Sequence, residues 1–210
     1  MTLGVTGYRT TIVTELLRHV DETVVSVGRS AADDVVLDLA ADFDVNKIPR
    51  DVDRWVLASG LLYPLRLKDQ TFAETAASIA VNLTSVVRIC EYLLDVNPRV
   101  RIAILGSESW RGSFDTTYFL SKVGVNAYVQ HRRLEHPAQQ IVVISPTIIM
   151  DSGMTQRRHD LDRVATRAAA GPKGRLLNAA EVARLVHFVL YQDDGALTNV
   201  VLSMNAGEFA

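Results

Sequence analysis

The sequence predicts an α/β fold in which a doubly wound parallel sheet is covered by helices on both faces. Segments with strand and helix patterns alternate along the 210 residues, and the chemically interesting residues follow the ends of strands. Apolar residues make up 48 % of the chain and charged residues 22 %, as in globular proteins with a large core. We find no repeat, low-complexity tract or linker, so we expect residues 1–210 to form one domain.

The individual elements follow from short apolar or β-branched runs, which indicate strands, and from longer stretches with apolar residues every three or four positions, which indicate helices. Pro98 lies just past the end of the longest helix, and Pro146 closes a strand. In order, we expect strand 3–6, helix 10–20, strands 23–27, 34–39 and 54–59, helix 71–95, strand 100–105, a loop over 106–116, a helix carrying Tyr118, strand 141–145, helix 179–191 and strand 200–203.

Charge and cysteine content narrow the class of protein. A net charge of −2 gives no reason to expect nucleic acid or an anionic membrane as partner. Cys90 is the single cysteine, so an internal disulfide is impossible and a reducing compartment fits. The five histidines show no metal-ligand spacing, and we predict no metal site. Without a leader or an uninterrupted apolar run of about 18 residues, we expect a soluble, cytoplasmic protein.

The most informative pair of residues is Tyr118 and Lys122, which stand four positions apart on a helix and therefore share one face. A fixed positive charge beside a phenol favours the phenolate and lowers the pKa of the tyrosine. The pair therefore indicates a proton-transferring tyrosine. The same spacing also occurs in pairs where the tyrosine packs and the lysine is solvated.

The connection after the first strand, Thr6-Gly7-Tyr8-Arg9, places backbone N–H groups and a helix start where a pyrophosphate could bind, as in Rossmann-type folds. About twenty residues later, Arg29 follows the second strand. An arginine there suits the 2′-phosphate of NADP(H), and Arg9 could supply a second positive charge; both could also be plain surface arginines.

In this order of motifs the chain resembles the short-chain dehydrogenases/reductases. The resemblance covers the whole chain and is carried by Thr6-Gly7, Asp38-Leu39, Ala58-Ser59-Gly60, Asn82, Ser107, Tyr118 with Lys122, Ser145-Pro146-Thr147 and Asn205-Ala206-Gly207. The chain departs from the family pattern at the first turn, which keeps one of three glycines, and at Ala58, where the family normally has asparagine. Ser107 also stands eleven residues before Tyr118, about two fewer than usual, and Ser109 is the alternative.

The resemblance implies four catalytic residues and a nicotinamide cofactor. Tyr118 would be the acid/base that exchanges a proton with a carbonyl or hydroxyl oxygen, and Lys122 would lower its pKa and bind the nicotinamide ribose. Ser107 would orient the substrate oxygen, and Asn82 would hold a water that links Lys122 to solvent. Besides Tyr118 and Lys122, the residues implied in binding NADP(H), or alternatively NAD(H), are Gly7, Tyr8, Arg9, Thr11, Ile12, Arg29, Asp38, Leu39, Ala58, Ser59, Gly60, Pro146, Thr147 and Ile149.

The segment 150–175 corresponds to the part that covers the substrate in this family. It is rich in basic residues, which indicates either an anionic small-molecule substrate or a solvated helix face. Trp110 and Phe114 could line an apolar substrate pocket or pack their own loop. The basic residues are Arg157, Arg158, His159, Arg163, Arg167, Lys173 and Arg175.

The leading interpretation is an NADP(H)-preferring oxidoreductase that acts on a carbonyl/alcohol pair. A non-catalytic or regulatory dinucleotide-binding protein is the alternative favoured by the reduced glycine turn, and an epimerase or dehydratase is a third. The resemblance also implies a homodimer or homotetramer through the two long helices. Val86, Val87, Cys90 and Val125 are compatible with such a contact but could equally face the sheet.

Overall fold

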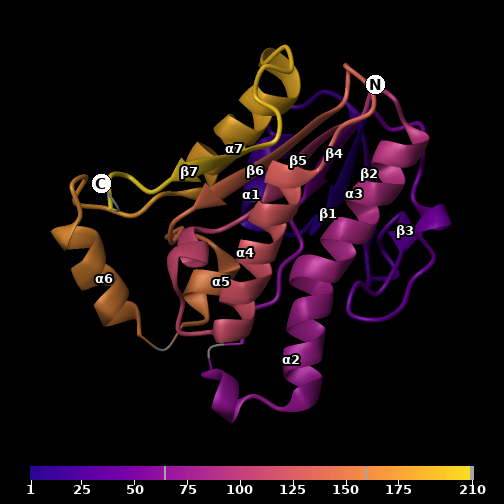
Figure 1. Cartoon of the computed structure of the whole chain (residues 1–210). Helices are drawn as coiled ribbons and strands as arrows, with labels where there is room; N and C mark the ends of the chain where they lie inside the picture. The colour runs from indigo at the N-terminus through magenta and orange to yellow at the C-terminus, as the bar shows by residue number, and fades with distance from the viewer. Residues whose placement is uncertain (64, 159, 209–210) are drawn as a thin grey trace.

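The computed structural model describes residues 1–63, 65–158 and 160–208. Seven parallel strands form one sheet in the order β3-β2-β1-β4-β5-β6-β7 (Figure 1). The order runs outwards in both directions from β1 and β4, so the sheet is doubly wound as predicted. The strands are β1 (Thr2–Thr6), β2 (Thr23–Gly28), β3 (Val35–Val36), β4 (Arg54–Leu57), β5 (Arg101–Leu105), β6 (Gln140–Pro146) and β7 (Val200–Met204).

Helices cover both faces of the sheet. On one face, α1 (Thr11–Leu17) and α7 (Ala179–His187) bury their apolar sides in one core cluster. On the other, α3 (Ser85–Val96) and α4 (Thr116–His131) lie in front of the sheet and bury theirs in a second cluster (Figure 1). Val86, Cys90 and Val125 belong to this second cluster, so these three side chains face the sheet and are not part of an outer contact surface.

The long helix predicted over 71–95 is observed as a continuous helical segment, Phe72–Val96, that contains a π-turn. Thr71 and Glu74 form a capping box that starts α2 (Phe72–Ile79), and the π-turn η3 (Ala80–Thr84) joins it to α3. Among the described helices, this segment alone is long and apolar enough to cross a membrane by length and composition, a test that core helices of soluble proteins also pass. Its α3 portion is packed on the sheet.

Two elements are shorter than predicted, for different reasons. Strand β3 covers two residues instead of six: the Asp34 carboxylate accepts hydrogen bonds from the N–H and hydroxyl of Ser26, and Asp38 accepts one from the N–H of Ala40, which turns the chain away. Helix α1 ends at Leu17 and not near residue 20, because the N–H of His19 bonds to the carbonyl of Leu16 and closes the helix.

The segment 150–175 is helical over much of its length. It contains α5 (Gly153–Gln156) and α6 (Leu161–Ala170), and α6 lies to one side of the molecule near the C-terminal segment (Figure 1). Val164 and Ala168 of α6 pack with Leu176 in a small separate cluster. The basic residues of this segment therefore lie largely on and around a short amphipathic helix.

The centre of the sheet is filled by Trp55 of β4, whose side chain is fully buried and whose indole N–H donates to the carbonyl of Val52 at 3.0 Å. Gly4 of β1 lies directly opposite in the parallel register. A Cβ atom built on Gly4 would come within 2.5 Å of the indole ring. Gly4 is therefore required because the ring occupies the space that a side chain would need.

We expect Gly4→Ala to lower the free energy of unfolding by about 1–3 kcal/mol, because the indole would have to leave its position in a filled core. Urea unfolding followed by tryptophan fluorescence measures the change. Gly153→Ala, at the exposed start of α5 where no atom lies within 4 Å of the added carbon, is the matched control and should change stability by less than about 0.5 kcal/mol. Equal effects of the two substitutions would contradict the packing argument.

Candidate active site

Tyr118 and Lys122 lie on the inner face of α4, and both side chains are buried, with 7 % and 3 % exposure. The Lys122 ammonium nitrogen is 5.3 Å from the centre of the Tyr118 ring and donates a hydrogen bond of 2.9 Å to the carbonyl of Leu105. Leu105 is the last residue of β5, and Ser107 follows two residues later. The structure thus brings the predicted pair to the carboxyl end of β5.

Burial controls the protonation of both groups. It raises the pKa of Tyr118 to about 12; a hydrogen bond with Ser107 lowers this pKa and the negative charge of Asp115 raises it. Burial also lowers the pKa of Lys122 to about 8. The expectation that Lys122 would bring the pKa of Tyr118 below its ordinary value is therefore wrong for this structure, because loss of solvent outweighs the neighbouring charge.

Ser107 begins the short 3-10 turn η4 (Glu108–Arg111), and its hydroxyl bonds to the hydroxyl of Ser109 at 3.0 Å. The next residue, Glu108, was missed by sequence reasoning. Its carboxylate is 3 % exposed and accepts hydrogen bonds from Ser203 of β7 and from Arg111. A glutamate after a strand gives no sign of burial, because its partner on β7 is 95 residues away in the chain.

Asn82 lies within the π-turn η3 and is fully buried. Its amide accepts a hydrogen bond from the N–H of Leu61 at 2.9 Å and donates one to the carbonyl of the same residue at 2.6 Å. Another donor bond reaches the carbonyl of Ser78. The side chain therefore fixes the loop after β4, a role that sequence reasoning did not assign, while its predicted role in a water relay stays a prediction.

Close packing brings the π-turn to the catalytic helix. A Cβ atom on Gly124 of α4 would lie 2.9 Å from a methyl group of Leu83 in η3. The missing side chain of Gly124 allows the two helices to approach each other here, between Lys122 and Asn82.

The turn after β1 keeps one glycine of a phosphate-binding turn, Gly7, and this glycine packs closely against the backbone at the end of β4. Gly7 has a φ of +70°, and a Cβ atom there would lie 2.7 Å from the backbone of Ala58. Within the described residues, no acceptor binds the backbone N–H groups of Tyr8, Arg9, Thr11 and Ile12. These free donors fit a pyrophosphate. Val13, in the first turn of α1, is fully buried and packs in the core cluster between α1 and the sheet.

The two arginines predicted to hold a 2′-phosphate differ in their surroundings. Arg9 donates to the Asp33 carboxylate at 2.9 Å, and Asp33 is buried directly over Gly28 at the end of β2. Arg29 is exposed, and no hydrogen bond or ion pair involves its side chain in the described part of the chain. Asp33 is a second residue that sequence reasoning missed. Its carboxylate meets Gly28 only because the turn at 29–32 folds the chain back over the end of β2.

The remaining residues implied in cofactor binding lie at the same edge of the sheet. Ala58 and Ser59 donate their N–H groups to the Thr6 hydroxyl, at 3.1 and 3.2 Å, which joins the ends of β1 and β4. Of the other implied residues, Gly60, Asp38 and Thr147 are solvent-accessible and Leu39, Pro146 and Ile149 are buried. Leu39 packs in the core cluster around Trp55, so its side chain is structural.

The segment after β6 lies against the turn that follows β1. The hydroxyl of Thr11 donates to the carbonyl of Asp151 at 3.2 Å. The methyl group of Met154 lies 3.7 Å from a Cβ position on Gly60. The segment after β6 is therefore bonded to the start of α1 through Thr11, and Met154 lies near Gly60 in the loop after β4.

Carboxylates pair with three of the basic residues in the segment 150–175. Arg158 forms two bonds with Asp160, Arg175 forms two with Glu181, and Arg167 pairs with Glu208. His159 lies outside the described residues. Since these three guanidinium groups already have anionic partners, the segment is less basic than its composition indicates.

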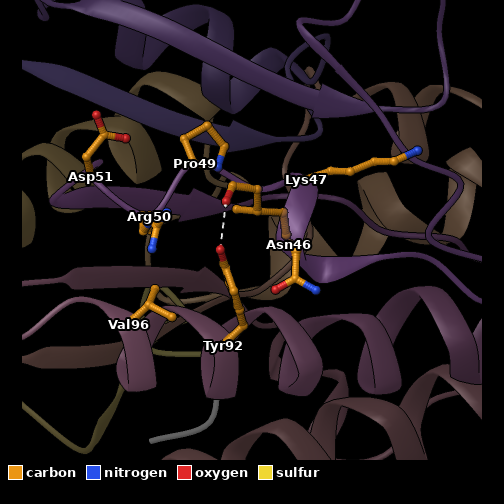
Figure 2. Close-up of a pocket in the computed structure, with 8 residues that line it drawn as sticks. Asn46, Lys47, Pro49, Arg50, Asp51, Tyr92 and Val96 are labelled. Carbon is orange, nitrogen blue, oxygen red and sulfur yellow. Dashed lines mark hydrogen bonds between the residues drawn. The ribbon is translucent and has the colours of Figure 1, made fainter.

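One cavity is distant from the carboxyl edge of the sheet. It has a volume of about 360 Å³ and lies between the connection from β3 to β4 and the end of α3, where the Tyr92 hydroxyl donates to the carbonyl of Ile48 (Figure 2). This is the amino end of the strands. Among the described residues, no group of three or more His, Cys, Asp or Glu side chains could hold a metal ion.

The depressed pKa of Lys122 makes stability depend on pH. Its folded pKa of about 8 is below the unfolded value of 10.5, so protonated Lys122 destabilises the fold below pH 8 and the penalty is relieved as pH rises. The free energy of unfolding should therefore rise by about 2 kcal/mol between about pH 7 and about pH 9.5 relative to Lys122→Met. Urea titrations of both proteins at each pH measure this, and parallel curves would contradict it.

The sequence matches no protein-family model and no curated protein sequence. Solved structures are similar over nearly the whole chain. A short-chain dehydrogenase/reductase of the glucose/ribitol type from Brucella melitensis has a TM-score of 0.86 and 19 % identity, and covers 100 % of this chain and 96 % of that one. A 3-alpha-hydroxysteroid dehydrogenase from a Pseudomonas species, complexed with NADH, has a TM-score of 0.78 and 17 % identity, covering 99 % and 96 %.

ElxO, solved with NADPH bound, has a TM-score of 0.82 and 17 % identity, covering 99 % of this chain and 98 % of that one. At these identities the likeness establishes the fold. The fold expected from the resemblance is confirmed: this chain is folded like the short-chain dehydrogenases/reductases.

Proposed function

We propose that the protein is a nicotinamide-dependent oxidoreductase of the short-chain dehydrogenase/reductase family that interconverts a carbonyl and an alcohol, with Tyr118 as the general acid/base. The observation that carries the proposal is the buried pair of Tyr118 and Lys122 at the carboxyl end of β5, with the half-buried Ser107 beside the phenol. Ligands bind at this edge in open parallel sheets. Two of the proteins with a similar fold were solved with NADH and with NADPH bound.

The side chains divide the chemistry among them. With a raised pKa, Tyr118 is protonated at neutral pH and is suited to donate its proton to a carbonyl oxygen. Ser107, which hydrogen-bonds to the phenol, would orient the same oxygen. Lys122 is held at the strand end by the carbonyl of Leu105 and would position the nicotinamide ribose. The bound cofactor supplies the hydride, and the protein supplies position and electrostatics.

The free N–H groups of the turn after β1 would bind the pyrophosphate, and we propose NADP(H) as the preferred cofactor. Arg29 at the end of β2 is exposed and available to a 2′-phosphate. Asp33 would oppose a phosphate at this position, but Arg9 already neutralises it. The positive charge of Arg29 is therefore left to attract the phosphate.

A second function, a non-catalytic protein that kept the fold, is favoured by one observation. The turn after β1 keeps one of the family's three glycines, and Thr11 beside it is bonded to the carbonyl of Asp151 in the segment after β6. Titration of the protein with NADPH and NADH by fluorescence separates the two functions. Absence of binding at millimolar concentration would leave only the non-catalytic function.

We also propose that the protein is cytoplasmic and that its substrate is a small molecule. We further propose that it assembles as a homodimer or homotetramer. Support for an assembly comes from the outer surface of α4, where Leu120 and Val123 are 50 % and 37 % exposed, and from Phe72 at the start of α2, which is 88 % exposed. Sedimentation velocity measures the assembly.

Tyr118→Phe should bind NADPH with unchanged affinity and lose at least about 10²-fold in kcat, since proton transfer by a positioned acid contributes about this much. Cofactor affinity by fluorescence titration and steady-state kinetics on a panel of ketones and aldehydes measure the two effects. Tyr92→Phe, whose hydroxyl bonds to Ile48 near the amino end of the sheet, is the matched control and should keep full activity. Full activity of the Tyr118 variant would show that another group is the acid.

Arg29→Ala should weaken NADPH binding by about tenfold or more and leave NADH binding nearly unchanged, because a charge-assisted bond to the 2′-phosphate contributes about 1.5–3 kcal/mol. Isothermal titration calorimetry with both cofactors gives the ratio. Arg157→Ala, also exposed but on the segment after β6, controls for general charge. Equal losses for both cofactors would argue against a 2′-phosphate contact.

A further inference from the structure

Asp115 carries a buried carboxylate at the start of the catalytic helix. Its side chain caps α4 by accepting a hydrogen bond from the N–H of Tyr118 at 3.0 Å. Two more donors come from the loop after β4: the N–H of Tyr63 at 3.2 Å and the amide of Gln70 at 3.1 Å. Asp115 is 2 % exposed, and no cation pairs with it among the described residues. A carboxylate buried without a cation is costly, and these three hydrogen bonds offset that cost.

Tyr118 is the titratable group on which this charge acts. On α4 itself, Lys122 lies 5.3 Å from the phenol ring, and from the end of β5 Ser107 provides a hydrogen bond. The neighbouring carboxylate of Glu108 is directed to Ser203 and Arg111. After the larger effect of burial, the negative charge of Asp115 raises the pKa of Tyr118 further. Asp115 thus opposes the influence that the helix start and Lys122 exert in favour of phenolate.

We propose that Asp115 is a positioning residue for Tyr118: its carboxylate ties the loop after β4 to the first turn of α4 and keeps the phenol in its protonated, proton-donating form. The inference rests on the proposed oxidoreductase function and adds to it the protonation state of its acid/base residue. In reduction, the carbonyl carbon receives a hydride from the reduced nicotinamide and the carbonyl oxygen receives the Tyr118 proton. The phenolate that remains is disfavoured by Asp115 and regains its proton from solvent.

Gln70 links the two parts of this arrangement. Its amide nitrogen donates to Asp115 and its amide oxygen accepts from the hydroxyl of Thr117 at 3.0 Å. The positional part of the role therefore depends on Gln70 together with the N–H of Tyr63, whereas the electrostatic part depends on the charge of Asp115 alone. Different substitutions can separate the two parts.

The test compares Asp115→Asn, which keeps a capping oxygen but removes the charge, with Gln70→Leu, which keeps the charge but removes the side-chain part of the link to the loop. Asp44→Asn removes a capping carboxylate at the start of an exposed 3-10 turn and controls for the loss of any cap charge. The readout is the ionisation of Tyr118 by NMR of ¹³Cζ-labelled tyrosine in the full chain. Tyr118→Phe identifies its signal among the six tyrosines.

Asp115→Asn should convert Tyr118 to phenolate at a lower pH than the wild-type protein, while Gln70→Leu and Asp44→Asn should leave its titration unchanged. In steady-state kinetics, the alkaline fall of the reduction rate should move to lower pH in the Asp115 variant. Should Asp115→Asn fail to fold, Asp115→Ser provides a second uncharged cap. A Tyr118 titration that is the same in all variants would overturn the proposal.

The NMR readout does not require a substrate. A protein without oxidoreductase activity in which Asp115→Asn still shifts the Tyr118 titration would refute the proposed function and retain the electrostatic role of Asp115. An active protein in which Asp115→Asn does not shift the Tyr118 titration would support the proposed function and refute the electrostatic role of Asp115.

Discussion

Every strand of the sheet runs parallel to its neighbours, so every connection from a strand into the following helix leaves from the same edge. This constraint places the turns after β1, β2, β4, β5 and β6 side by side, although they are up to 140 residues apart in the chain. The contact between Thr11 and Asp151 spans that distance. The candidate site therefore depends on the topology of the sheet. Its residues come from separate turns, and no local sequence signal connects one turn with the next.

Loss of solvent is the second determinant of the site. Tyr118 and Lys122 are almost fully enclosed, so each tends towards its neutral form: the phenol retains its proton more strongly and the ammonium loses one more easily. Polar side chains near the site are themselves satisfied. Asn82 bonds to the backbone of Leu61, and Glu108 accepts hydrogen bonds from donors on two elements. These bonds hold the loop after β4 and the turn after β5, which lie beside the candidate site.

The sequence alone could predict what is encoded over short distances. Alternation of strands and helices predicted the parallel sheet, and the spacing of Tyr118 and Lys122 predicted a shared face, which the structure confirms. The pKa direction of Tyr118 was wrong because burial is a property of the whole fold. Glu108, Asp33 and Asp115 were missed for a related reason: acidic residues in loops are usually solvated, and only the tertiary contacts of these three reveal that they are buried.

The π-turn at Asn82 has a consequence for how this helix can change. A π-turn contains one residue more than the regular helix would need, and each helical residue rotates the chain by about 100°. Because the π-turn absorbs its extra residue locally, deleting one residue within Ala80–Thr84 would restore a regular helix and leave α2 and α3 close to their present phase. What would change is the local backbone around Asn82, which directs its amide to Leu61. The irregular turn therefore sets the position of one side chain, while the two halves of the long helix pack as a regular helix would.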